Sequence, residues 1–211
     1  NDRGVQQIYE NYINRGVKRS GNDVAFGDYM LNESYDFIIL DFKHGNDLLE
    51  RNALTLVSLI ERLNTTYASG YQQDITLIGP SMGSLIAQYA LAYMEKNNIP
   101  HHVKTYISFD GCHQGANVPI GLQNYIEYFT KKGIFKKKES IRKGLYNGLA
   151  AKQMLAHHTS ANSQSVAPDA LRIKFLQNLT AVGEYPQLCR KVAIINGVSS
   201  GIKNEYHSNA N

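Results

Sequence analysis

Short apolar runs alternate along this chain with stretches in which apolar residues recur at helical spacing. The apolar runs, each bounded by glycine or polar residues, are predicted to be buried β-strands. They span residues 35–42, 74–79, 103–110 and 191–197. Helical spacing predicts helices over residues 5–15, 48–64 and from Ser81 to about residue 97. Strands and helices alternating in short units predict an α/β fold, with a mostly parallel sheet and helices on both of its faces.

A long excursion, residues 111–190, separates the third predicted strand from the fourth. Its three helix-like segments predict a helical insertion, which we expect to act as a lid beside one edge of the sheet. These segments span residues 121–130, 145–158 and 168–182. The predicted organisation is a core over 1–110, the insertion over 111–190, and a late core strand with the C-terminal segment over 191–211.

The helix predicted over 48–64 begins after a polar loop. Asp47, followed three residues later by Glu50, resembles a capping box with Asp in the place of Ser or Thr. We therefore expect these two side chains to satisfy the free N–H groups at the start of that helix.

The second predicted strand runs directly into the next helix through Gly79-Pro80-Ser81-Met82-Gly83. Gly-x-Ser-x-Gly is common by chance, but a strand before it and a helix after it are typical of a nucleophile elbow. Such a turn holds its serine in a strained conformation with the hydroxyl exposed. The residues two before and two after the serine must be small, because larger side chains would collide across the turn. Ser81 is therefore the candidate nucleophile, and the alternative is a plain glycine-rich loop.

The elbow needs an oxyanion donor, a base and an acid. The backbone N–H of Met82 is the candidate oxyanion donor, because a helix N-terminus favours negative charge. A base must take the serine proton, and the order along such chains is serine, acid, histidine. Asp110, at the end of the third strand, is the candidate acid, with a turn cap as its alternative role. His207, after the fourth strand, is the candidate base, although it lies close to the chain end.

Two other histidines lie on loops beside predicted strands. His113 follows Asp110 closely, and we favour a role in ordering that loop over a role in the pocket or in catalysis. His44 follows the first predicted strand and could line the pocket, but it precedes the serine and so has the wrong place for the base. The histidines and the two cysteines show no metal-ligand spacing, so no metal is predicted.

The bulk composition limits the class of protein. The chain has 211 residues, of which 43% are apolar, and this fits one globular domain. The net charge of +4 is concentrated in residues 131–143, which we interpret as a solvated face and alternatively as a contact for an anionic partner or membrane surface. The chain lacks the interleaved basic and aromatic pattern of nucleic-acid readers and any run long enough to span a membrane. The richness in Asn, Gln, Ser and Tyr, without Trp, favours a secreted or cell-surface protein.

With these motifs in place, the chain resembles the α/β-hydrolase superfamily on its lipase and esterase side. The segment LIGPSMGSLIAQYAL is similar to the elbow and its helix, and DFKHGNDLLERNA resembles lipase-like hydrolases of the Bacteroidetes kind. ISFDGCHQGANVPIGL is similar to a Pro-His-x-Gly strand end in bacterial lipase-like proteins, with Cys112 where proline is usual. The resemblance covers residues 35–125 and 191–197. It implies a Ser81 nucleophile, a Met82 oxyanion donor, and hydrolysis of a small-molecule or lipid acyl bond without a cofactor.

The chain departs from the family pattern in three places. Ser84 stands where a second glycine is often found. The family's second oxyanion donor follows an earlier strand, and its histidine follows the last strand, so we interpret the chain as a fragment or as trimmed at its ends. The acid is then Asp110 or lies beyond residue 211, with Asp169 and Glu184 of the insertion as weaker candidates, and the base is His207 or a histidine outside this chain. Three functions remain open: a serine hydrolase that forms an acyl-enzyme, a non-catalytic hydrolase-like binding module, and an acyltransferase.

Overall fold

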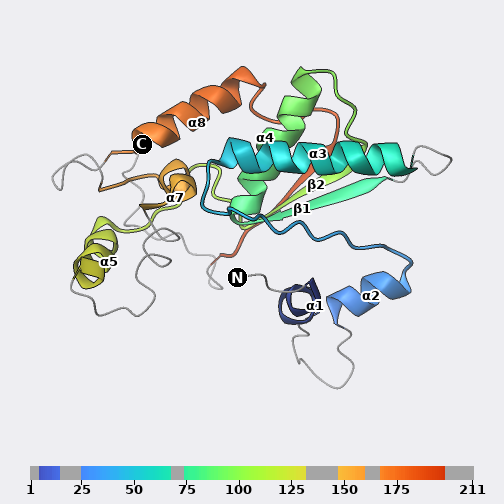
Figure 1. The fold of residues 1–211 in the computed structure, drawn as a ribbon, viewed down its shortest axis with the longest axis horizontal. Helices are drawn as coiled ribbons and strands as arrows, with labels where there is room; N and C mark the ends of the chain where they lie inside the picture. The colour runs from blue at the N-terminus through green and yellow to red at the C-terminus, as the bar shows by residue number, and fades with distance from the viewer. Residues whose placement is uncertain (1–4, 15–24, 68–73, 132–146, 160–166, 198–211) are drawn as a thin grey trace. The chain divides into compact units, whose positions relative to one another are not determined.

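A computed structural model describes residues 5–14, 25–67, 74–131, 147–159 and 167–197 of the chain (Figure 1). The chain divides into two compact units, Asn1–Phe42 and Lys43–Asn211.

The first unit contains short helices held together by aromatic side chains. Helix α1 (Val5–Ile8) continues as a π-helical turn, η1 (Tyr9–Ile13), so the predicted N-terminal helix is confirmed over these residues. A further helix, α2 (Phe26–Asn32), was not predicted. The ring of Tyr9 lies so close to Gly27 that a side chain there would meet it within 2.7–2.8 Å. The Tyr9 hydroxyl donates a hydrogen bond of 3.1 Å to Asp28, which fixes η1 against α2.

The strand predicted over residues 35–42 is wrong. These residues belong to no strand of the structure, and several of their apolar side chains are exposed, including Tyr35 at 55% and Ile38 at 53%. A strand exists only when its backbone groups pair with a neighbour. This run is short, apolar and bounded by polar residues, which is the pattern that predicted a buried strand. In the described part of the chain, however, no strand pairs with it.

The second unit is built on a parallel sheet of three strands in the order β1-β2-β3. The strands are β1 (Ile75–Pro80), β2 (Val103–Phe109) and β3 (Arg190–Ile194), which confirms the other three predicted strands. Pro80 pairs with Phe109, and Phe109 pairs with Ile194. The carboxyl ends of all three strands therefore lie at one edge of the sheet, where parallel α/β folds place their sites.

Helix α4 (Met82–Lys96) packs on β1 and β2, and α3 (Leu49–Tyr67) packs on α4 (Figure 1). Buried residues of α3 recur at helical spacing, whereas α4 is buried almost continuously from Ser84 to Ala92. A helix buried on most of its circumference is typical of one enclosed between a sheet and other helices. The predicted α/β fold with a parallel sheet and helices is thus confirmed. Helices on the second face of the sheet stay a prediction, because the side chains that point there remain 43–46% exposed: Ile78, Phe109 and Ile194.

Helices α5 (Ile120–Lys131), α7 (Leu149–Met154) and α8 (Ala170–Ala181) follow β2 and precede β3, as the predicted insertion requires. Helix α7 is shorter than the predicted segment 145–158. It ends because Leu155 turns into an extended conformation and forms a parallel bridge with Ala116. The domain boundaries at 110 and 190, and the role of these helices as a lid, stay predictions.

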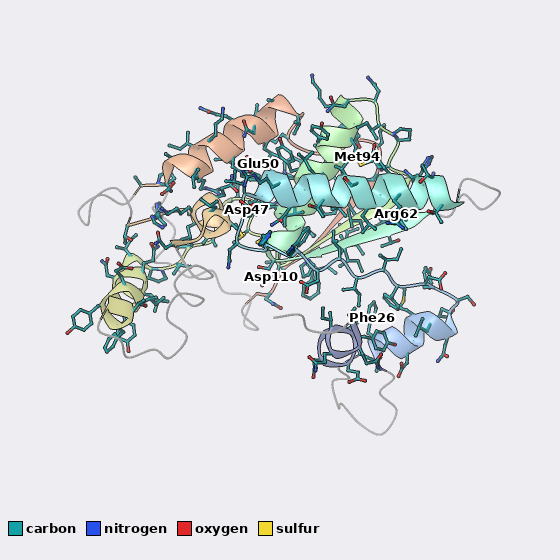
Figure 2. The ribbon with its side chains drawn as sticks, in the orientation of Figure 1. Phe26, Asp47, Glu50, Arg62, Met94 and Asp110 are labelled. Atoms are coloured by element: carbon teal, nitrogen blue, oxygen red, sulfur yellow. The ribbon has the colours of Figure 1, made fainter. Side chains whose placement is uncertain are left out.

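The predicted capping box at the start of α3 forms only in part. Asp47 accepts a hydrogen bond of 2.8 Å from the N–H of Leu48. Glu50, at the N-terminal end of α3 (Figure 2), instead accepts bonds of 2.7 Å from Gln153 in α7 and 2.9 Å from Asn178 in α8. Gln153 also accepts from the N–H of Leu49 at 2.7 Å and so caps α3 from another helix. Partners from the insertion have replaced the local partner that the motif predicts.

Candidate functional site

Ser81 occupies the turn between β1 and α4 in a conformation that few non-glycine residues adopt. Its φ is 49° and its ψ is −116°, and its side chain is exposed. A positive φ in a residue with a Cβ is unfavourable and persists only where the surroundings impose it. The predicted strained serine, exposed at the carboxyl edge of the sheet, is therefore what the structure contains.

The two glycines of the turn differ in how tightly they are enclosed. A Cβ added to Gly79 would meet backbone atoms of Gly83 at 2.5 and 2.6 Å and the nitrogen of Ser84 at 2.8 Å. A Cβ added to Gly83 would come no closer than 3.2 Å, to Cδ of Pro80. The turn therefore requires glycine at position 79, whereas position 83 has some tolerance.

Hydrogen bonds fix the turn to both neighbouring elements. The N–H of Ser81 donates to the carbonyl of Phe109 on β2 at 2.8 Å. The buried hydroxyl of Ser84 donates to the carbonyl of Gly79 at 2.5 Å, which ties the first turn of α4 back to the end of β1. The buried hydroxyl of Tyr106 donates to the carbonyl of Ser84 at 2.6 Å. The serine that replaces the family's second glycine thus has a structural role that the sequence did not indicate.

Met82 is the first residue of α4. The N–H groups of a first helical turn have no carbonyl four residues earlier within the helix, so they are free to bind an acceptor. They also lie at the positive end of the helix dipole. Met82 therefore has the place that an oxyanion donor next to Ser81 requires.

Asp110 directly follows β2, which pairs with β1 in the sheet, and it lies at the edge where α4 begins (Figure 2). It also has a positive φ, 53°, and its N–H donates to the carbonyl of Ile194 on β3 at 2.7 Å. Its exposed carboxylate receives a long contact of 3.5 Å from the side-chain amide of Asn196. The register thus brings Asp110 and Ser81 to the ends of adjacent strands.

The candidate histidines do not join this pair in the described structure. His207 lies outside the described residues. The carbonyl of His44 accepts bonds from Asp47 at 2.9 Å and from Asn52 at 3.4 Å, so this residue shapes the loop before α3. The Ser81 side chain makes no capping hydrogen bond to the first turn of α4.

His113 is engaged at both ring nitrogens by buried side chains. Nε2 lies 2.8 Å from the hydroxyl of Ser108 on β2, and Nδ1 lies 2.7 Å from Oε1 of Gln88 on α4. The amide nitrogen of Gln88 donates to the carbonyl of Glu184 at 2.8 Å, so its oxygen is the atom that faces the ring. Nδ1 must then carry the proton, and Nε2 accepts from Ser108. Burial lowers the pKa of His113, which favours this neutral form.

The remaining candidate chemistry in the described residues is limited. Cys112 and Cys189 are free thiols, and burial raises the pKa of each. Over the ranges that the structure describes, no group of His, Cys, Asp and Glu side chains could hold a metal ion. The same ranges contain no helix with the length and apolar character needed to cross a bilayer.

In a comparison with protein families, residues 9–205 match the model described as PGAP1-like alpha/beta domain. No curated protein matches the chain. No solved structure matches it either.

Proposed function

Because the chain belongs to the PGAP1-like alpha/beta domain family, a family of the α/β-hydrolase superfamily, we propose that it is a serine hydrolase of an ester or related acyl bond. Ser81 attacks the acyl carbonyl and forms an acyl-enzyme, and water then releases the acid. Met82 donates its N–H to the oxyanion, and Asp110 orients the base. The observation that carries this proposal is the conformation of Ser81, strained and exposed between a strand and a helix.

The base of this proposal is His207, which completes the order serine, acid, histidine along the chain. His113 does not fit that role, because both of its nitrogens already have buried partners. The substrate is a small-molecule or lipid acyl compound, and the helices between β2 and β3 form part of its pocket. A secreted or cell-surface protein without a nucleic-acid partner remains the expectation from composition, and a bacterial source remains the expectation from the resemblance to bacterial lipase-like proteins.

Hydrolysis of p-nitrophenyl esters of increasing acyl length tests the proposal. Ser81→Ala should lower kcat/KM by about 10³-fold or more, because no other group replaces the nucleophile. Ser58→Ala is the matched control, since Ser58 is an exposed serine on α3 whose hydroxyl donates to the carbonyl of Leu54 in the same helix. Equal turnover in Ser81→Ala and the wild type would exclude this nucleophile.

The acid and the base are tested in the same assay. Asp110→Asn and His207→Ala should each lower kcat by about 10²-fold or more, because His207 takes the proton of Ser81 and Asp110 orients His207. A variant with near-wild-type turnover removes its residue from the triad. Added alcohol distinguishes the acyltransferase alternative, because an ester product then forms in place of the acid. The binding-module alternative predicts ester binding without turnover.

A further inference from the structure

The loop after β2 carries Asp110 in a left-handed conformation and then folds back against the sheet. Gly111 fits there only because it lacks a side chain, since a Cβ would meet Ser108 and Ser84 atoms at 2.4–2.7 Å. Two residues later, His113 bonds to the hydroxyl of Ser108. The backbone from Asp110 to His113 is thus closed into a tight loop over the end of β2.

The position of Asp110 depends on this loop more than on its own side chain. Among the described residues, the carboxylate has only the 3.5 Å contact from Asn196, which is too long to orient it. Its N–H is held by Ile194 on one side. On the C-terminal side of Asp110, His113 is the first residue of the loop whose side chain forms short hydrogen bonds to buried side chains of β2 and α4. A left-handed aspartate keeps its conformation only if such neighbours impose it.

His113 is anchored by two side chains that are themselves almost fully enclosed. Ser108 is 5% exposed and Gln88 is 1% exposed. Gln88 is in turn bonded to the carbonyl of Glu184, just after α8. The resulting chain of hydrogen bonds runs from Ser108 through His113 and Gln88 to Glu184 and joins β2, α4 and the end of the insertion.

We propose that His113 is a positioning residue that holds Asp110 beside Ser81 through its bonds to Ser108 and Gln88. This inference rests on the proposed function for its catalytic consequence. It assigns His113 no contact with substrate and no transfer of a proton to Ser81. Its effect on turnover passes entirely through Asp110.

Kinetics of the full chain test this role. His113→Ala should lower kcat for a p-nitrophenyl ester by about tenfold or more and leave KM within about twofold, because the pocket stays while the acid moves. His113→Asn, whose amide can still donate to Gln88, should recover part of the loss. In the Asp110→Asn background, His113→Ala should add less than about a twofold further loss, because residues that act as a unit are not additive. A folded His113→Ala protein with kcat within about twofold of wild type, or a full multiplicative loss in the Asp110→Asn background, overturns the proposal.

Hydrogen exchange separates this inference from the proposed function. In His113→Ala, amide exchange in residues 109–115 should accelerate by about tenfold or more, while peptides from α3 keep the wild-type rate. Unchanged exchange in 109–115 overturns the positioning role even if the enzyme is active. If the wild type has no esterase activity, the proposed function fails, but accelerated exchange would still support the role of His113 in holding the loop.

Discussion

Replacing Gly79 with alanine should destabilise the protein far more than the same change at Gly83. The two residues are equivalent in the Gly-x-Ser-x-Gly pattern, but their surroundings differ. An added Cβ at position 79 meets three backbone atoms at 2.5–2.8 Å, whereas at position 83 the nearest atom is Cδ of Pro80 at 3.2 Å. Backbone atoms in the first turn of α4 cannot move without displacing the helix, so the collision at 79 cannot relax cheaply.

The magnitude follows from these contacts. Overpacking a well-packed site costs about 1–3 kcal/mol, and Gly79→Ala lies at the upper end because backbone atoms are involved. In a chain of this size, about 3 kcal/mol lowers Tm by about 6–12 °C. Gly83→Ala should stay within about 1 kcal/mol of wild type, since the helix propensity of alanine offsets the closer contact with Pro80.

Thermal unfolding followed by circular dichroism, with urea titration as a second measure, compares the two variants with the wild type. Equal losses of stability in Gly79→Ala and Gly83→Ala would refute the reasoning from the turn geometry. So would a Gly79→Ala protein as stable as the wild type.

Three further predictions concern buried and partly buried polar side chains of the second unit. Tyr106→Phe should cost about 0.5–1.5 kcal/mol in a urea titration, because the buried carbonyl of Ser84 loses the side-chain donor that it has in addition to its partner within α4, and a cost below about 0.3 kcal/mol would contradict this. Glu50→Ala should cost a similar amount and show a coupling energy of about 0.5 kcal/mol or more with Asn178→Ala in a double-mutant cycle, whereas additive effects would show that the bond contributes nothing. Stability should fall as the pH is lowered below about 6.5, because burial lowers the pKa of His113 and His158, so the unfolded chain binds more protons there. Urea midpoints at pH 7.0 and 5.5 check this, and the fall should be smaller in His113→Asn; a midpoint difference unchanged by that substitution would contradict the contribution of His113.

The sequence predicted the local structure of the strand, the serine turn and the following helix well, because the signals that form them are local. An apolar strand, a serine with a glycine two residues to either side, and a run with helical spacing follow one another in residues 74–97, and the structure contains β1, the strained Ser81 and α4 there. The run at 35–42 has a similar apolar pattern but forms no strand. Pairing with a neighbouring strand decides that outcome, and no pattern within eight residues contains this information.

The roles of several polar side chains could not be predicted for the same reason. Glu50 has the spacing of a capping box, but Gln153 and Asn178, more than a hundred residues away in sequence, bind it instead. His113 was expected to order its loop, and its bonds to Ser108 and Gln88 agree with that expectation. The identity of those partners follows only from the packing of α4 on β2.

Reaction with a fluorophosphonate probe, followed by digestion and mass spectrometry, tests the assignment of Ser81 as nucleophile most directly. The probe phosphonylates only a serine that its surroundings have activated. We predict an adduct on the peptide that contains Ser81, retained in Ser58→Ala and absent in Ser81→Ala. A folded wild-type chain that takes up no probe, or a Ser81→Ala chain that is labelled as fast as the wild type, would contradict the assignment.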